Sequence, residues 1–382
     1  MNKSISPKIR FKGYIDTWEQ RKLGDIGSVA MCRRIFKHQT SESGEIPFFK
    51  IGTFGGEPDA FISRELFEEF KAKYPYPEMG DILISASGSI GRTVEFTGKN
   101  EYFQDSNIVW LKHDKSITNP FLRQLYSVVE WAGIEGSTIK RLYNDNILKT
   151  EVMLPSVQEQ TKIAEMFSEI DAIITLHQRR HTKLQNLKKS MLRKMFPHDN
   201  SGIPEVRLKG FTGAWSLQKL NTFVNYSSSN LAAKDSMNKG RYDLYDANSI
   251  IGKTDHTPMA EDYITIIKDG AGVGRIRMLP KNTMFIGTMG ALTAKDSDLN
   301  FIFVLLTANN LGGSFSGSTI PHIYFNDYGE NTYFIPHYDE QRAIGRFFDN
   351  LDDLIRSEDD YISKLLLMKQ AFLNKMLVKV EA

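Results

Sequence analysis

A long helical pattern follows Pro155, where apolar residues recur at alternating steps of four and three positions as far as Pro197. The same pattern returns after Pro336 and runs toward the end of the chain. A repeat of 3.5 residues is typical of a helix that buries one seam against a second helix. The sequence therefore predicts two helices, residues 157–196 and 338–379, each roughly 60 Å long at 1.5 Å per residue.

We expect the two helices to pack on each other, because a helix of this length would otherwise expose its apolar seam to water. Polar residues interrupt the seam, among them His177 and Glu358. The predicted interface of the helix pair consists of Ile163, Phe167, Ile170, Ile174, His177, Leu184, Ile344, Phe348, Leu351, Ile355, Glu358, Ile362 and Leu365.

The distribution of charge favours an antiparallel pair. Residues 177–196 carry seven cations and no acid, whereas residues 339–360 carry eight acids and three cations. Antiparallel packing sets these stretches beside each other. Each exposed ion pair contributes only about 0.2–1 kcal/mol, so the charges select the orientation more than they stabilise the pair. Positions 177 and 358 are equivalent, and we expect His177 and Glu358 to meet there as a polar layer.

The equivalence of these positions reflects a duplication. GSTIKRLYNDN at 136–146 returns as GSTIPHIYFND at 317–327, 181 positions later. PKIRFKGYIDTWEQRKL at 7–23 returns as PEVRLKGFTGAWSLQKL at 204–220, 197 positions later. The chain therefore contains two copies of one unit that differ in length in the middle. Two copies are too few for a solenoid, so a domain is duplicated.

The two copies are least similar in their middle regions, residues 24–135 and 221–316. The sequence there predicts short strands, turns and a few helices. Each region contains a strand–turn–strand pattern with a Gly-Arg pair, Gly91-Arg92 or Gly274-Arg275, at the junction of the turn and the second strand. The predicted fold class is α+β. It comprises two mixed domains, residues 1–156 and 197–337, each followed by one long helix of an antiparallel coiled coil.

Composition is that of a globular protein, with 41% hydrophobic and 25% charged residues among 382. The single cysteine, Cys32, excludes an intrachain disulfide and suits a reducing compartment. The amino terminus has no apolar run typical of a signal peptide, and no stretch is long enough to span a bilayer. We expect a cytoplasmic protein without membrane contact.

Catalytic patterns are weak. HQRRH at 177–181 has the histidine spacing of a zinc-binding helix but lacks its glutamate, so packing explains it better than a metal. Asp59 with Glu69 and Lys71 loosely matches a metal-dependent nuclease, which leaves a self-contained Mg²⁺-dependent DNA enzyme as an alternative. Asn119-Pro120-Phe121 lacks the second proline of an adenine methyltransferase motif. We expect no catalytic residue and no cofactor or metal site in this chain.

Basic residues are more informative, because Lys and Arg bind phosphates while Asn, Ser and Arg bond base edges. The net charge of only +2 argues against a protein that coats DNA, but it permits local positive faces. The predicted DNA-binding residues are Arg33, Arg34, Lys37, Ser89, Arg92, Lys140, Arg141, Asn230, Lys234, Lys239, Arg241, Arg275 and Arg277.

Taken in order, these motifs resemble the specificity subunit of type I restriction-modification enzymes. The resemblance covers essentially the whole chain. It is carried by Trp18 and Trp215 in the opening segments, the hairpins ending in Gly-Arg, the Gly-Ser-Thr-Ile segments, and the Pro…Glu-Gln…Ile block that opens each long helix.

The resemblance implies a DNA-binding subunit that is not catalytic by itself. Each of its target-recognition domains would read one half of a bipartite, asymmetric site in double-stranded DNA, and the helices would set the gap. Two methyltransferase subunits and two restriction subunits would be its partners, and S-adenosylmethionine, ATP and Mg²⁺ would be bound by them. A protein-assembly scaffold without DNA contact is a further alternative, but it does not explain why the two domains differ.

Overall fold

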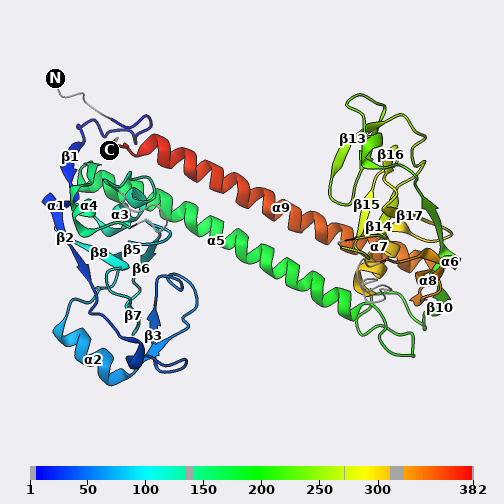
Figure 1. Ribbon diagram of the computed structural model, residues 1–382, viewed down its shortest axis with the longest axis horizontal. Helices are drawn as coiled ribbons and strands as arrows, with labels where there is room; N and C mark the ends of the chain where they lie inside the picture. The colour runs from blue at the N-terminus through cyan, green and yellow to red at the C-terminus, as the bar shows by residue number, and fades with distance from the viewer. Residues whose placement is uncertain (1–5, 134–140, 271, 310–321, 381–382) are drawn as a thin grey trace. The chain divides into compact units, whose positions relative to one another are not determined.

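The computed structural model describes residues 6–133, 141–270, 272–309 and 322–380 (Figure 1). Its contacts divide the chain into two units. Met1–Leu176 with Tyr361–Ala382 form the first unit, and His177–Asp360 form the second. Each unit therefore contains one domain together with part of each long helix.

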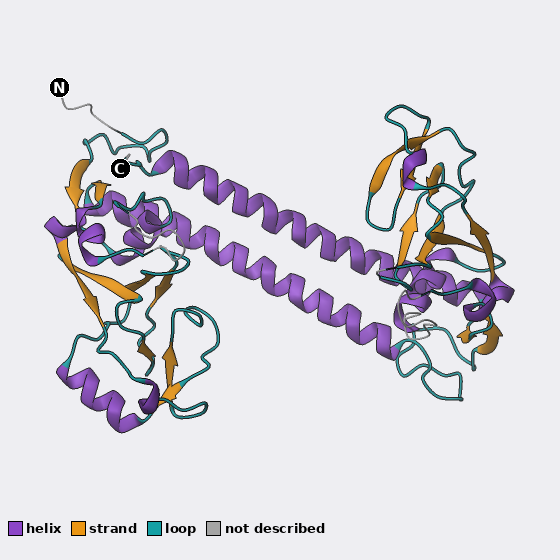
Figure 2. Ribbon diagram, viewed as in Figure 1, coloured by secondary structure: helices purple, strands orange, loops and turns teal. Residues whose placement is uncertain are grey.

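The domain of the first unit is built from short strands and helices (Figure 2). Its elements are β1 (Glu19–Lys22), α1 (Leu23–Ile26), β2 (Gly27–Met31), η1 (Lys37–Gln39), β3 (Ile46–Phe49), β4 (Phe61–Ile62), α2 (Arg64–Lys73), β5 (Ile82–Ser85), β6 (Thr93–Glu95), β7 (Tyr102–Phe103), β8 (Ile108–His113), α3 (Asn119–Tyr126), α4 (Asn144–Lys149) and β9 (Glu151–Leu154). They form three sheets with the strand orders β2-β8-β5-β6, β4-β3-β7 and β1-β9.

The domain of the second unit repeats this topology. Its elements are β10 (Ser216–Lys219), α6 (Leu220–Phe223), β11 (Val224–Ser228), η2 (Ala233–Asp235), β12 (Tyr242–Tyr245), β13 (Ile250–Thr254), β14 (Tyr263–Ile267), β15 (Ile276–Leu279), β16 (Thr283–Phe285), β17 (Met289–Ala294), α7 (Leu299–Asn309), α8 (Phe325–Tyr328) and β18 (Thr332–Ile335). The sheets β11-β17-β14-β15, β13-β12-β16 and β10-β18 correspond strand for strand to those of the first domain. The two predicted hairpins are confirmed as β5–β6 and β14–β15.

Helix α2 explains most of the difference in length between the copies. β12 begins at Tyr242, 196 positions after the start of β3 at Ile46. β14 begins at Tyr263, only 181 positions after the start of β5 at Ile82. The extra residues of the first domain therefore lie between β3 and β5, most of them after β4, where α2 is found. The core strands before and after it keep their equivalents.

The two predicted long helices are confirmed as α5 (Val157–Lys194) and α9 (Tyr338–Met376). Their first turns pack into the domain cores, where Ile163 and Phe167 lie in the core of the first unit and Ile344 and Phe348 in that of the second. These seam residues therefore contact the domains as well as the other helix. Ile170, Ile174 and Leu351 are also buried, while Leu184, Ile355, Ile362 and Leu365 are half-buried. Among the described residues, no helix combines the length and apolar character needed to cross a membrane.

The helices run antiparallel in the second unit. His177 Nδ1 lies 2.5 Å from Glu358 Oε2, and further along α5 the Nζ of Lys188 lies 2.5 Å from Oδ1 of Asp352. Residues further toward the C-terminus of α5 therefore contact residues further toward the N-terminus of α9, as in an antiparallel pair. In the first unit, Lys369 Nζ lies 2.5 Å from Asp171 Oδ1. Because 171 and 188 are repeat-equivalent to 352 and 369, the same ion pair is formed in each unit.

The polar layer predicted from the sequence is confirmed. Glu358 is buried and accepts from His177, and its other carboxylate oxygen lies 3.2 Å from Arg180 Nε. One turn along α5, His181 Nε2 lies 3.1 Å from Asp359 Oδ1. The two histidines of HQRRH therefore face carboxylates of α9.

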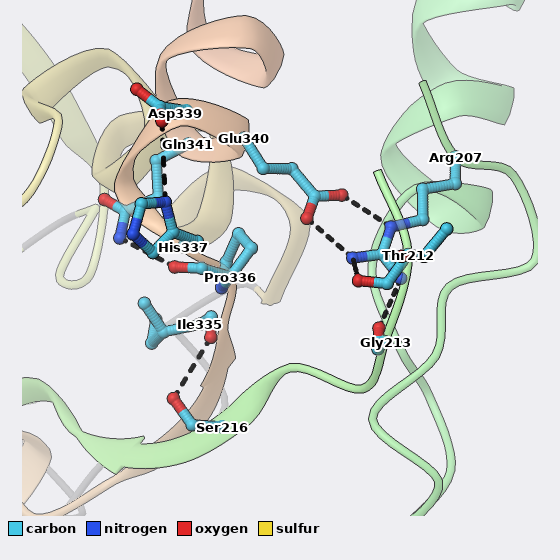
Figure 3. A network of polar contacts seen from close by, with 10 residues as sticks. All are labelled: Arg207, Thr212, Gly213, Ser216, Ile335, Pro336, His337, Asp339, Glu340 and Gln341. Atoms are coloured by element: carbon cyan, nitrogen blue, oxygen red, sulfur yellow. Dashed lines mark hydrogen bonds and ion pairs between the residues drawn. The ribbon is translucent and has the colours of Figure 1, made fainter. Parts of the chain in front are cut away.

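A buried carboxylate anchors each long helix to its opening segment. In the second unit, Glu340 forms a two-bond ion pair with Arg207, at 2.8 and 2.7 Å, and the guanidinium also donates to the carbonyls of Thr212 and Gly213 (Figure 3). The next residue, Gln341, donates to Pro336 O at 3.0 Å.

The first unit contains the same anchor. Glu159 accepts two hydrogen bonds from Arg10, at 2.6 and 2.7 Å, and this bonding raises the pKa of Arg10 above its ordinary value. Gln160 accepts from the backbone N–H of Thr118 at 2.9 Å and donates to Pro155 O at 3.1 Å. The Pro…Glu-Gln block therefore joins the opening segment, the domain and the long helix.

Replacing Glu159 by Ala leaves Arg10 largely buried without its partner. We expect the free energy of unfolding to fall by about 3–5 kcal/mol, the usual cost of removing one member of a buried ion pair. Urea denaturation measures it. The matched control is Glu165→Ala, which removes an exposed ion pair with Lys162 in the same helix and should cost under about 1 kcal/mol. Equal costs for the two variants would contradict the anchor.

Replacing Glu358 alone by Ala removes the carboxylate that bonds His177 in the helix seam and should cost about 1–3 kcal/mol. The double variant His177→Leu with Glu358→Leu should regain that stability, because apolar replacement of a buried polar pair is often neutral or stabilising. Thermal unfolding compares the two. A double variant as unstable as Glu358→Ala would show that the layer contributes to stability beyond its pairing.

Candidate nucleic-acid interface

Each domain presents a glycine-containing hairpin tip next to the residues expected to bind DNA. In the first domain, the tip lies between Ser85 and Arg92, and Gly88 and Gly91 have positive φ angles of 67° and 81°. Side chains with a Cβ rarely adopt this conformation, which explains the glycines. Ser85 Oγ accepts the backbone N–H of Arg92 at 2.9 Å and so closes the tip. Ser89 is exposed in it.

The arginine at the end of each hairpin tip also forms hydrogen bonds to a neighbouring loop. Arg92 donates to the carbonyl of Ile51 at 3.4 Å. Arg275 donates to the carbonyl of Ala247, which is repeat-equivalent to Ile51, and to Asn248 Oδ1 at 2.8 Å. The Gly-Arg motif therefore fastens the hairpin to the loop that follows β3 or β12. The sequence suggested a phosphate contact for these arginines and did not show this second role.

Arg277 is likewise engaged within the second domain. It donates to the carbonyl of Asn248 at 3.1 Å, and its guanidinium lies 5.1 Å from the centre of the Tyr245 ring. Arg241 lies 3.2 Å from Asp255 Oδ1 and 5.5 Å from the Tyr242 ring centre. Asn230, Lys234 and Lys239 are exposed.

The loop between β7 and β8, residues 104–107, joins the basic stretch after β2 to the hairpin. Gln104 Oε1 accepts from Ile51 N at 2.8 Å, and Asn107 Oδ1 accepts from Ser87 Oγ at 2.7 Å. Between them, Asp105 accepts from Arg34 Nε at 2.7 Å. The structure thereby brings together two predicted groups, Arg33 to Lys37 and Ser89 to Arg92, that are far apart in the sequence. This loop was missed by sequence reasoning, because its role depends on long-range contacts.

A groove of about 770 Å³ lies beside this loop in the first domain. Its lining includes the cations Arg34, Lys37 and Lys50, the aromatic ring of Phe36, the amide of Gln104, and the carboxylates Glu42, Asp59 and Asp105. Phe36 is exposed and stacks on His38 with ring centres 5.9 Å apart. Arg33 points to a different neighbour, since its guanidinium lies 5.2 Å from the Tyr74 ring centre. Cations, an exposed aromatic ring and an amide in one groove suit the backbone and bases of a nucleic acid.

A second concave region of the first domain contains Arg141. It measures about 530 Å³ and includes Met31, Ala86 and Ser106. A backbone bridge pairs Arg141 with Ser87 at the hairpin tip. Lys140 lies outside the described residues.

In the second domain, the bridge equivalent to that of Arg141 pairs His322 with Asp269. His322 Nδ1 lies 2.6 Å from Asp269 Oδ1. Sequence reasoning did not select either residue, although the repeat alignment places His322 at the position of Arg141.

The patterns considered for catalysis do not assemble into a site. Asp59 pairs with Lys50 at 2.9 Å, Glu69 pairs with Lys73, and Lys71 lies over the Phe67 ring. In the described part of the chain, no three His, Cys, Asp or Glu side chains are arranged to hold a metal ion. The nuclease alternative gains no support from this geometry.

Asn119-Pro120-Phe121 begins helix α3, where Asn119 Oδ1 lies 2.6 Å from His113 Nε2 and Phe121 is buried in the core. Burial also raises the pKa of the Cys32 thiol to about 12, which makes it unreactive. Both motifs therefore have structural roles here.

Residues 15–186 and 214–366 match the family described as type I restriction modification DNA specificity domain. A putative type I restriction enzyme specificity subunit of Haemophilus influenzae is 54% identical over 153 residues, which is 40% of this chain and 40% of that protein. The putative type I restriction enzyme MjaX specificity subunit of Methanocaldococcus jannaschii is 23% identical over 390 residues, 91% of each chain.

Solved structures share the fold. The crystal structure of a type I restriction-modification system S subunit from M. genitalium has a TM-score of 0.66 at 17% identity and covers 99% of this chain and 100% of that one. A chain from a structural study of complex assembly and conformational transition of the type I R-M system has a TM-score of 0.56 at 13% identity, covering 96% and 99%. The family match spans most of both repeats, and the chain belongs to the family of type I restriction-modification DNA specificity domains.

Proposed function

We propose that this chain is the specificity subunit of a type I restriction-modification complex, and that each domain reads one half of a bipartite, asymmetric DNA site. The observation that carries the proposal is the contrast within the duplication. The two domains have the same strand order and the same fastened hairpin, yet the side chains beside the hairpin differ. Two domains that share a backbone fold but carry different contact residues are suited to recognising two different DNA sequences.

The charge distribution supports DNA as the ligand. Arg34, Lys37 and Arg92 are exposed on the first domain, as are Lys234 and Lys239 on the second. Cations at such positions bind phosphates irrespective of sequence, whereas amide and guanidinium groups discriminate base edges in the major groove. The small net charge suits local contact faces of this kind.

The long helices would set the gap between the half-sites. Two domains that bind the major groove from the same face of B-DNA must be spaced near one helical turn of the DNA apart, about 34 Å. A packed helix pair holds a fixed separation, which a flexible linker would not. Changing the length of the helices should therefore change the gap and leave the half-sites as they are.

Exposed apolar residues on the helices support partner subunits. Ile173 and its repeat-equivalent Leu354 are exposed, and so are Leu187 and its equivalent Met368. Ile173 and Leu187 are two heptads apart, as are Leu354 and Met368. Such spacing suits a helix packing on the outer face of the pair. The proposed partners are two methyltransferase subunits.

The remaining parts of the complex carry the chemistry. The methyltransferase subunits would bind S-adenosylmethionine, and two restriction subunits would bind ATP and Mg²⁺. This chain would be non-catalytic by itself and would act in the cytoplasm. Methyl transfer that requires both this chain and the methyltransferase subunit, with no Mg²⁺-dependent cleavage by this chain alone, is the expected result of reconstitution. Cleavage by the purified chain would favour the nuclease alternative.

Exchanging residues 24–135 for the same region of another family member should change one half-site only. The replaced region contains the first hairpin and the loop between β7 and β8, whereas the second domain and both long helices are retained. Sequencing of DNA selected from a random duplex pool measures both half-sites. A swap that altered both halves together would contradict the assignment of one half-site to each domain.

Replacing Leu187 and Leu354 by Glu should weaken assembly with the methyltransferase subunit at least tenfold. Each buried Leu contributes about 1.5–3 kcal/mol, and a buried unpaired carboxylate adds a further cost. Titration of the labelled chain with that subunit measures the affinity. The control is Gln185→Glu, which adds a charge at an exposed position roughly 200° around α5 from Leu187. Unchanged affinity in the double variant would remove this face from the interface.

A further inference from the structure

We propose that Arg34, oriented by Asp105, is a guanine-reading residue of the half-site bound by the first domain. The inference rests on the proposed function, since it requires that this domain binds DNA. It goes further by assigning one base to one side chain.

The geometry leaves the end of the guanidinium available. Arg34 Nε donates to Asp105 Oδ2 at 2.7 Å, and in the described part of the chain Nη1 and Nη2 have no hydrogen-bond partner. The Arg34 side chain is 61% exposed, whereas that of Asp105 is 15% exposed. The Asp105 carboxylate is therefore largely buried and bonds Nε of Arg34, while the side chain of Arg34 remains mostly exposed to solvent. Both residues line the groove beside the loop of residues 104–107.

This arrangement matches guanine. The major-groove edge of guanine presents two adjacent acceptors, O6 and N7, and the two parallel N–H groups at the end of an arginine fork bond both. An acceptor on Nε fixes the plane of the fork, so less freedom is lost when the base is bound. Lys in the same place would keep the charge but has no planar fork for Asp105 to orient, so its contact with O6 and N7 would be less directional.

The neighbouring amide adds to the same preference. Gln104 Oε1 accepts the backbone N–H of Ile51, and because a backbone N–H can only donate, the accepting atom is the oxygen. The N–H groups of Gln104 are then its donors toward the groove that it lines. A set of donors disfavours adenine and cytosine, which present their own amino donors in the major groove.

The second domain lacks both members of the pair. η1 and η2 are equivalent elements, which places Asn230 at the position of Arg34. The backbone bond from Gln104 N to Phe49 O corresponds to that from Ile286 N to Tyr245 O, so Gly287 occupies the position of Asp105. The arginine and its orienting carboxylate are thus absent together. The guanine preference should belong to one half-site only.

Stability alone does not account for the pair. An ion pair with one largely exposed partner contributes little to folding. The side chain can therefore be changed without unfolding the domain, and effects on recognition can be separated from effects on structure.

The test is selection from a random duplex pool by the full-length chain, followed by sequencing. The wild-type chain should select a bipartite motif with a guanine at one position of the first half-site. Arg34→Lys should lower the preference for that guanine by roughly 5- to 150-fold, the discrimination of one bidentate pair. The second half-site and the salt dependence of binding should stay unchanged, because the charge is retained. Asp105→Asn should weaken the same preference to a smaller extent.

Arg64→Lys is the matched control. Arg64 Nε also faces a carboxylate, Glu45 Oε2 at 3.2 Å, and Arg64 does not line the groove. It should leave the motif unchanged. A bipartite wild-type motif that is identical in Arg34→Lys, or that loses a base other than guanine, would overturn the inference and leave the proposed function standing. Failure of the wild-type chain to select any bipartite motif would overturn the proposed function itself.

Discussion

A buried carboxylate at the start of each long helix is the interaction on which the rest of the structure depends. Glu159 and Glu340 are almost fully removed from solvent, and each is neutralised by an arginine from the segment that opens its own repeat. A buried carboxylate without such a partner would be costly. The domain and the start of its helix therefore cannot separate without exposing or unpairing a charge. The glutamine that follows each glutamate adds hydrogen bonds to the domain backbone.

With the helix ends fixed in this way, the middle of each domain is free to vary. The first domain accommodates the extra helix α2, and the two copies differ in the loop that follows β7 or β16. Neither difference disturbs the strand order or the bond from the hairpin arginine to the carbonyl of Ile51 or Ala247. The frame thus supports two surfaces of different chemistry, and the properties of one surface do not predict those of the other.

The sequence predicted the elements that rest on periodicity and repetition. The heptad pattern gave both long helices, and the charge asymmetry gave their antiparallel orientation. The duplication itself placed His177 opposite Glu358. These features could be predicted from the sequence because each depends on residues at regular spacing or on matched positions of the two copies. The hairpins were readable for the same local reason, since alternating apolar runs flanked a glycine-rich turn.

The candidate nucleic-acid interface could be predicted from the sequence only in part. The basic residues near Arg34 and the hairpin near Arg92 were selected separately, but nothing local indicates that residues 104–107 connect them. The bonding of Arg92 and Arg275 to loop carbonyls was hidden as well, because a sequence does not show which acceptor a long side chain reaches. Contacts between distant segments are set by tertiary packing, and a single sequence carries no direct record of them.

The facing of His177 and Glu358 has a consequence for how such a helix pair can be made. These two positions are equivalent in the duplicated sequence, so two identical repeats packed in this register would set His against His or Glu against Glu. Two buried carboxylates would repel each other, and two imidazoles would lack the acceptor that Glu358 provides. Joining the copies in one chain allows the two residues to differ. The covalent link thereby permits an unlike pair at a position where a symmetric dimer is confined to like ones, and this pair favours packing of α5 on α9 over packing of either helix on a second copy of itself.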